Sequence, residues 1–350
     1  MQDGLAETSR RALIDYGIRL LACQLGQHLP TSGPLAALLR ADDPVAAKAL
    51  AWVREQLGDY APLDAPAAVR PLRSIFSLIA LDDERRHKPE SSTVPLRPLD
   101  LNLRAGESES PKAIWGGFTR DIARIPEGAG MFASFVALVA RHGWAVAGSM
   151  ITPGVSVYEQ FRTVAALVAT FTADEQSLLL VEGDLSGIQE MLFTITSKGA
   201  AKNLRGRSLY LQLLSDALGR AVLYELDLPE VCMISSAGGN FRLLARAGDV
   251  ARLEEARRAL NHRLLRLHGG DLAFALAWAP VDASDLASNA FVEAAEELAK
   301  RLDVQKSRPF ADLVDEEFAT VAGVVGSGQD TFCAICHVEL ADAPADPSPE

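Results

Sequence analysis

The sequence predicts an α+β protein, in which a helical N-terminal part precedes a unit of four strands and two long helices. Apolar residues recur at helical spacing over 12–25 and 157–171, whereas short continuous apolar runs appear after residue 176. From there the predicted order is strand, helix, strand, strand, helix, strand, with a Gly-Gly turn between the second and third strands. That order is typical of a ferredoxin-like βαββαβ sandwich, with both helices on one face of an antiparallel sheet.

Each element of this unit is marked by an apolar run or an amphipathic pattern that ends at glycine or at charged residues. Strands are predicted over 177–181, 231–236, 241–245 and 272–279, and helices from about 208 to 226 and over 250–267. The stretch between the first strand and the helix at 208 is also predicted to be helical, with a break at Lys198–Gly199.

Composition limits the classes of protein that are compatible with this chain. Its 350 residues are 49% hydrophobic and 23% charged, with a net charge of −12, which excludes a generally basic nucleic-acid coat but not a local basic groove. We find no uninterrupted apolar run of about 18 residues and no signal-peptide pattern at the start. The four cysteines do not form a disulfide framework in a chain this long. A cytoplasmic, reduced protein without a membrane partner is therefore predicted.

Changes in amino-acid composition and hydrophobic pattern along the chain predict its domain boundaries. A run rich in charge, proline and serine over 82–110 separates two helical regions, and the strand-bearing part begins at 176. The predicted parts are a helical domain over 1–110, a helical segment over 111–175, the βαββαβ domain over 176–283, and a helix with a linker over 284–350.

The most informative motif, Gly183-Asp184-Leu185-Ser186-Gly187, stands where the first strand gives way to a helix. Palm-type nucleotidyl transferases hold Mg²⁺ and a triphosphate with an aspartate at such a strand end and with backbone N–H groups of the following turn. The alternative is an ordinary strand–turn–helix junction with Asp or Ser as the helix cap. The Gly238–Gly239 hairpin at the matching position of the unit favours the palm.

The hairpin lacks the second acidic group that two-metal chemistry requires. Asn240 and Phe241 follow the two glycines, where a nucleotide cyclase would carry acidic residues. An amide oxygen is a poor substitute for a carboxylate as a Mg²⁺ ligand. The sequence therefore predicts a palm with an incomplete metal site.

Two further groups of residues carry chemical information. Four positive charges, Lys198, Lys202, Arg205 and Arg207, predict an anion-binding patch, although a solvated helix face remains the alternative. Cys333 and Cys336 have the spacing of half a tetrahedral zinc site, and two free thiols are the alternative. The six histidines include no His-Asp dipeptide, so no His-Asp metallophosphohydrolase is predicted, and Gly116–Gly117 is predicted to be a turn.

Three strings resemble the first palm domain of the large subunit of type III-A CRISPR effector complexes, Csm subtype. They are Gly183–Gln189, Thr196–Leu214 and Ser236–Phe241, and the long middle string is the most specific. Residues 155–166, and Lys306–Phe310 ahead of the two cysteines, support the resemblance, which covers about Leu72 to Cys336. The chain is similar to the N-terminal portion only of that subunit.

The family's large subunit contains a His-Asp (HD) nuclease domain that cuts single-stranded DNA, a first palm, a zinc linker, a second palm with Gly-Gly-Asp-Asp, and a helical domain. Together its palms convert ATP into cyclic oligoadenylates. The resemblance implies a degenerate HD-like N-terminal domain, with the DNase activity lost, and a first palm without the Gly-Gly-Asp-Asp palm. It follows that the chain alone is not expected to be an active enzyme.

The resemblance also implies a set of site residues, cofactors and partners. ATP binds together with a second palm that supplies Mg²⁺, and no catalytic residue is predicted in this chain. Partners are the small and guide-end-binding subunits, and guide RNA and target transcript through the complex. The implied nucleotide-binding residues are Asp184, Ser186 and Gly187 on the phosphate side, Lys202, Arg205 and Arg207 as positive charges, and Gly238 and Gly239 at the hairpin. Cys333 and Cys336 are implied as half of a Zn²⁺ site.

Two other functions remain open from the sequence. One is a stand-alone homodimeric nucleotidyl cyclase or polymerase, against which the missing hairpin carboxylate argues. The other is a non-catalytic structural adaptor of a ribonucleoprotein complex, in which the two cysteines bind no metal.

Overall fold

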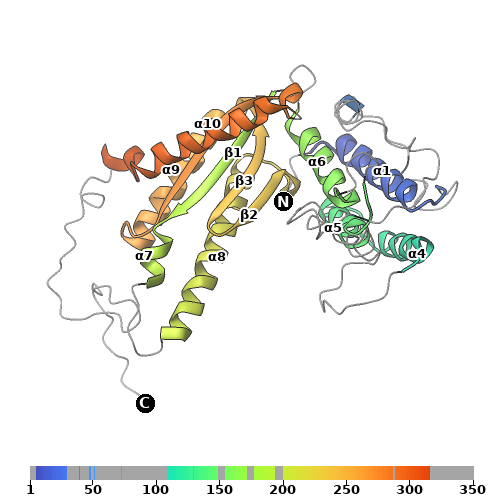
Figure 1. Cartoon of the computed structure of the whole chain (residues 1–350), viewed down its shortest axis with the longest axis horizontal. Coiled ribbons are helices and arrows are strands. Elements are labelled where there is room, and N and C mark those ends of the chain that lie inside the picture. The colour runs from blue at the N-terminus through green and yellow to red at the C-terminus, as the bar shows by residue number, and fades with distance from the viewer. Residues whose placement is uncertain are drawn as a thin grey trace, which may run out of the picture. The chain divides into compact units, whose positions relative to one another are not determined.

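The computed structural model describes residues 5–29, 39, 47–48, 51, 72, 109–128, 130–148, 154–171, 177–193, 200–286 and 288–315. The chain divides into two compact units (Figure 1). A helical unit comprises residues up to 178 with 227–232 and 282–287, and a sheet unit comprises 179–226, 233–281 and the chain from 288 onward. In the described part of the chain, no helix is long and apolar enough to cross a membrane.

The helical unit consists of packed helices, and serine side chains cap the starts of two of them. Ser110 and Ser156 each accept a hydrogen bond from the backbone N–H three residues later, which satisfies a donor that the first helical turn leaves unpaired. The helices are α1 (Glu7–Gln24), α4 (Pro111–Ile122), α5 (Met131–Gly143) and α6 (Val157–Thr170), with short 3₁₀ turns η4 (Glu230–Cys232) and η6 (Ala283–Asp285).

Aromatic rings form the core of this unit. Phe135 of α5 lies edge-on to Phe118 of α4 and to Phe161 of α6, with ring centroids 6.3 and 5.6 Å apart. Gly17 of α1 faces Phe135, where an added Cβ would lie 2.9 Å from the ring. Such edge-to-face contacts, together with the burial of the rings, hold the helices against one another.

The sheet unit contains a four-stranded antiparallel sheet in the order β2-β3-β1-β4. Along the chain, the strands and helices follow the predicted order (Figure 1). The elements are β1 (Ser177–Ser186), α7 (Ile188–Phe193), α8 (Ala200–Glu225), β2 (Met233–Ala237), β3 (Asn240–Arg246), η5 (Ala247–Asp249), α9 (Val250–His268), β4 (Ala273–Asp282), α10 (Asn289–Lys306) and η7 (Ala311–Leu313).

Two of the predicted boundaries differ most from the structure. The first strand continues past residue 181 to Ser186, since Gly183 gives Phe241 of the neighbouring strand room to pack against the backbone, where an added Cβ would overlap the ring. The long helix begins at Ala200 rather than near Ser208, so the predicted basic patch lies on its first turns.

The helices α8 and α9 cover one face of the sheet. They contact each other, and α8 also contacts β2 and β3. Phe241 and Phe274 stack at 5.9 Å on this face, and Gly219 of α8 lies under Phe241. Asn261 of α9 binds both backbone groups of Phe274, at 2.7 and 2.9 Å, and so joins α9 to β4.

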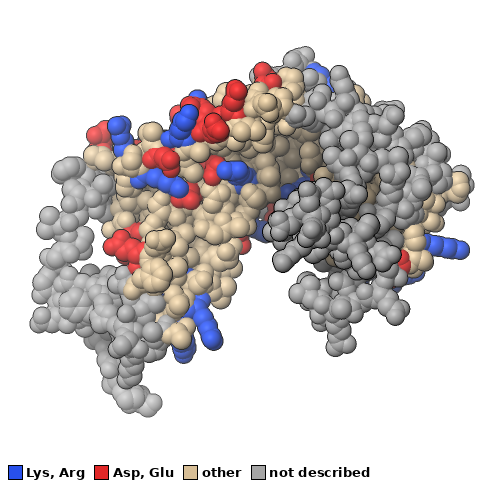
Figure 2. All heavy atoms as spheres, viewed as in Figure 1, with Lys and Arg blue, Asp and Glu red and all other residues tan. Residues whose placement is uncertain are grey.

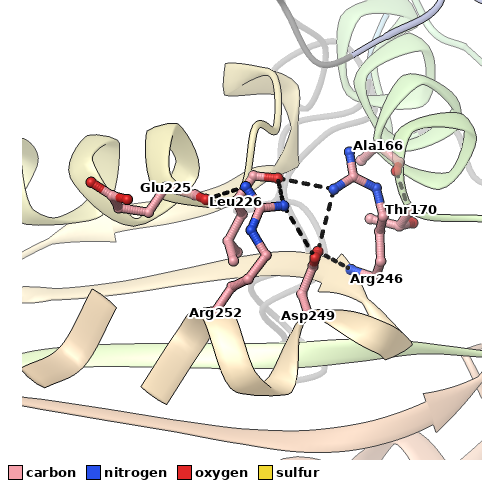
Figure 3. A network of polar contacts seen from close by, with 7 residues as sticks. All are labelled: Ala166, Thr170, Glu225, Leu226, Arg246, Asp249 and Arg252. Carbon is pink, nitrogen blue, oxygen red and sulfur yellow. Dashed lines mark hydrogen bonds and ion pairs between the residues drawn. The ribbon is translucent and has the colours of Figure 1, made fainter. Parts of the chain in front are cut away.

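A polar network joins the end of α8 to the start of α9 (Figure 3). Arg246 and Arg252 both donate to the backbone oxygen of Leu226, each at 2.9 Å, and Arg252 also donates to that of Glu225. The buried Asp249 carboxylate accepts from the backbone N–H of Arg246 and from both guanidinium groups. The network therefore satisfies carbonyl groups that a helix end leaves unpaired.

Candidate functional site at the end of the first strand

The glycine-containing motifs at the end of β1 and in the β2–β3 hairpin meet at one end of the sheet. The backbone N–H of Leu185 donates to the oxygen of Gly239 at 2.8 Å. Gly239 also faces Ile188, the first residue of α7, so closely that an added Cβ would overlap the isoleucine side chain. The structure thus brings together two segments that are about fifty residues apart in the sequence.

Backbone conformation requires glycine at the turn after β1. Gly187 has φ +93° and lies against the carbonyl oxygen of Asp271, which leaves no space for a side chain. In the hairpin, Gly238 also has a positive φ, +65°, but nothing lies within 4 Å of the position where its Cβ would be. A ligand can therefore approach the hairpin backbone at Gly238.

Asp184 lies near the end of β1 and is paired with a lysine from another element. Its Oδ2 lies 3.0 Å from Nζ of Lys306, the last residue of α10. The side chains keep 20% and 35% of their exposure, so both remain accessible to a ligand. Ser186, the last residue of β1, is half-buried.

A second carboxylate on β1, Glu182, was not predicted as a site residue. Side chains two residues apart on a strand point to the same face, so Glu182 and Asp184 share the face opposite Gly183 and Phe241. Glu182 is buried, and it accepts a hydrogen bond from Asn240 Nδ2 at 2.7 Å and one from Arg242 Nε at 2.9 Å. The sequence did contain a signal for this site residue, because an acidic residue directly follows four apolar residues that are buried in the strand.

These contacts do not fit a Mg²⁺ site. Each carboxylate on this face of β1 is already paired with a basic side chain, Arg242 or Lys306. Among the residues that the structure describes, no group of three or more His, Cys, Asp or Glu side chains could hold a metal ion. Asn240 occupies the hairpin position at which a nucleotide cyclase would carry a metal-binding carboxylate. Its amide N–H donates a hydrogen bond to Glu182.

Comparison with known proteins tests the predicted resemblance. Residues 177–322 match the model of the family described as Csm1 subunit domain B. This chain is a homologue of Cas10/Csm1. The predicted resemblance to the large subunit of type III-A CRISPR effector complexes is thereby confirmed.

One similar protein is the CRISPR system single-strand-specific deoxyribonuclease Cas10/Csm1 (subtype III-A) of Thermococcus onnurineus. The two are 27% identical over an alignment of 314 positions, which covers 81% of this chain and 38% of the relative. Solved structures of a Csm1–Csm4 cassette, one in complex with cA4 and one with one ATP, share the fold with a TM-score of 0.64 each, at 20% and 21% identity. Each match covers 87% of this chain and 49% of the Csm1 chain, so this chain spans about half of its solved relatives.

The predicted basic residues of this Cas10/Csm1 homologue occupy two different settings. Lys202 and Arg205 are exposed on the first turns of α8. In Figure 1 this end of α8 extends past α7 and away from the sheet, and Figure 2 shows positive side chains in the same place. Arg207 is buried and donates to the backbone oxygen of Met191, so it joins α8 to α7. Lys198, Cys333 and Cys336 lie outside the described residues.

The helical unit contains a His–Asp pair that the sequence did not reveal, because the two residues lie on different helices. His142 Nε2 of α5 lies 3.0 Å from Asp121 Oδ2 of α4. Burial lowers the pKa of His142, and the hydrogen bond and charge of Asp121 oppose this effect. Gly116 and Gly117, predicted as a turn, are inside α4, where Gly117 gives the imidazole room, with an added Cβ only 3.1 Å from Cε1.

Proposed function

We propose that this chain is the ATP-binding half-site of a type III-A effector large subunit in antiviral defence. In this proposal the sheet unit is a ferredoxin-like palm, and a second palm completes the site for cyclic oligoadenylate synthesis. The observation that carries the proposal is the meeting of the β1–α7 turn with the Gly238–Gly239 hairpin. The similar Csm1–Csm4 cassettes in complex with ATP and with cA4 support this ligand class.

The proposed roles follow from exposure and geometry. The turn formed by Ser186 and Gly187 presents backbone groups to the phosphates, beside Asp184. The hairpin backbone at Gly238 and Gly239 forms the opposite wall. Lys202 and Arg205 attract phosphates or a neighbouring subunit from the start of α8, and Arg207 acts through its bond to α7.

The proposal is tested by titrating ATP into the chain alone and into the chain mixed with a second palm from a relative. We expect weak binding alone and an increase of about ten-fold or more with the second palm, since half of the contacts come from it. Gly238→Leu should abolish this increase, because its side chain would project into the open space at the hairpin.

The matched control is Gly128→Leu in the helical unit. Gly128 also has a positive φ, +113°, and open space around it, so leucine is strained there too, but this glycine belongs to the other unit and to neither site motif. Equal ATP affinity with and without the second palm would contradict the proposal and would favour the structural adaptor. Mg²⁺-dependent ATP turnover by the chain alone, abolished by Asp184→Ala, would favour the stand-alone cyclase.

We further propose that the helical unit is a degenerate HD-like domain that does not cut single-stranded DNA. The buried position of His142 and its bond to Asp121 support this, because a metal ligand needs a nitrogen that the ion can reach. Cleavage of single-stranded DNA by the chain in Mn²⁺ would contradict it. Zinc binding by Cys333 and Cys336 stays a prediction, as do the contacts with effector subunits, guide RNA and transcript, and the cytoplasmic location.

A further inference from the structure

We propose that Lys306 is a ligand-binding residue of the site at the end of β1, and that its ammonium group bridges Asp184 to a nucleotide phosphate. In this position Lys306 replaces the divalent cation that would otherwise join a carboxylate to a phosphate. The inference deepens the proposed function and rests on it. It predicts that this half-site binds nucleotide phosphates without Mg²⁺.

The geometry of the pair leaves Lys306 able to bind a second group. Its Nζ lies 3.0 Å from Asp184 Oδ2, and more than a third of the lysine side chain is exposed. An ammonium group has three donors, so contact with Asp184 leaves two for phosphate oxygens. A lysine held by a carboxylate at one side and open at the other can therefore bridge the two anions.

The turn after α10 fixes the position from which Lys306 reaches Asp184. Phe310 and Leu313, just beyond the helix, are buried against Leu265 of α9. Asp312 forms an ion pair with Arg257 of α9 at 2.8 Å. Because both contacts hold the end of α10 to the sheet unit, Lys306 is directed at β1 by packed structure and not by a free chain end.

The neighbouring carboxylate follows the same pattern. Glu182 is buried and is paired with Arg242, whose side chain is 45% exposed. On this face of β1 the carboxylates are therefore the inner groups, and the cations Arg242 and Lys306 are the outer ones. Such a face suits phosphate oxygens and does not suit Mg²⁺, in agreement with the absence of a metal cluster from the described residues.

The test compares ATP affinity in Mg²⁺ and in EDTA between wild type and Lys306→Met, for the full chain with a second palm. The two aspartates of that palm's Gly-Gly-Asp-Asp motif are changed to asparagine, so that any dependence on Mg²⁺ reports this half-site alone. Wild-type affinity should change by no more than about two-fold between the two conditions. Lys306→Met should lose about ten-fold or more in EDTA, as expected for a lost charge-assisted hydrogen bond, and should regain part of it in Mg²⁺ because Asp184 is then free for the metal.

Two controls separate this role from a structural one. Lys306→Arg should keep binding in EDTA, since a guanidinium can also contact both anions. Lys300→Met removes an exposed lysine from the same helix and should bind ATP as wild type does. The Lys306→Met protein should also keep its melting temperature within about 3 °C, because exposed ion pairs add little stability.

Two results would overturn the inference alone. One is Lys306→Met with wild-type affinity in both conditions, and the other is wild-type binding that requires Mg²⁺. Failure of the wild type to bind ATP even with the second palm would instead overturn the proposed function, and this inference with it.

Discussion

Gly187 is the residue at which conformation and space together restrict the sequence most tightly. Its φ is +93°, and the Asp271 carbonyl occupies the direction in which a side chain would point. Gly187→Ala should therefore destabilise the sheet unit by roughly 2–4 kcal/mol, because the backbone before β4 would have to shift. Denaturant unfolding of the purified protein, followed by tryptophan fluorescence, measures the change.

The control for this substitution is Gly206→Ala. Gly206 lies inside α8 with open space around the position of its Cβ, so alanine should leave stability unchanged or raise it by up to about 1 kcal/mol. If the Gly187→Ala protein were as stable as the Gly206→Ala protein, the backbone of Gly187 could not lie as close to the Asp271 carbonyl as the structure describes.

The buried His142 should make the helical unit sensitive to acid. Burial lowers its pKa below the ordinary 6.5, against the opposing effect of Asp121, and the nearby Arg141 lowers it further. The unfolded chain thus takes up a proton that the folded unit resists, so stability is full above about pH 6.5 and falls as the pH drops below it. The melting temperature should decrease between about pH 7.5 and about pH 5.5, and His142→Gln should reduce that decrease. The same decrease in both proteins would assign it to other groups.

At the residue scale, local motifs in the sequence were enough to predict site residues. The sequence did not predict which residues, distant along the chain, pair with them. Asp184 stood out because a glycine motif surrounds it, and its position at the strand end is as expected. Its partner Lys306 belongs to a helix more than a hundred residues later, and only the packing of the turn around Phe310 against α9 brings it there. Glu182 and Asn240 were interpreted separately, although one accepts a hydrogen bond from the other.

At the scale of the elements, a polar network joins α8, β3 and α9 (Figure 3). Asp249→Ala would leave two arginine side chains without their shared carboxylate, and the backbone N–H of Arg246 without its acceptor. We expect a loss of roughly 2–3 kcal/mol in the free energy of unfolding, since the carboxylate is buried.

Glu297→Ala provides the comparison for an exposed ion pair. Glu297 and Arg301 lie one turn apart on α10, and their side chains keep half of their exposure. This substitution should cost less than about 1 kcal/mol. If thermal or denaturant unfolding showed equal losses for the two substitutions, the network at Asp249 would not stabilise the junction.

The order of the elements followed from the sequence, whereas some of their ends did not. Apolar periodicity predicted both long helices of the sheet unit and the hairpin, which has a two-residue Gly-Gly turn as expected. Glycine misled the prediction at Gly183 and at Gly117, where it leaves room for a neighbouring ring inside an element. Whether a glycine ends an element depends on what lies against it, and that is a tertiary property.

At the scale of the whole molecule, two units of different kind are joined in one chain, and the candidate site belongs to the sheet unit alone. The chain matches about half of the length of each of these solved Csm1 chains. The proposal that a second palm completes the site therefore makes ATP binding a property of an assembly. Contacts from another palm are not encoded in the packing of this one, so neither its sequence nor its fold could reveal them.

The most direct test of this central claim is photoaffinity labelling with an azido-ATP, applied to the chain together with a second palm and followed by peptide mapping. The account predicts labelling of the peptides that contain the Ser186–Gly187 turn and the Gly238–Gly239 hairpin, weaker or absent when the second palm is omitted. Labelling confined to the helical unit, or equally strong without the second palm, would contradict it.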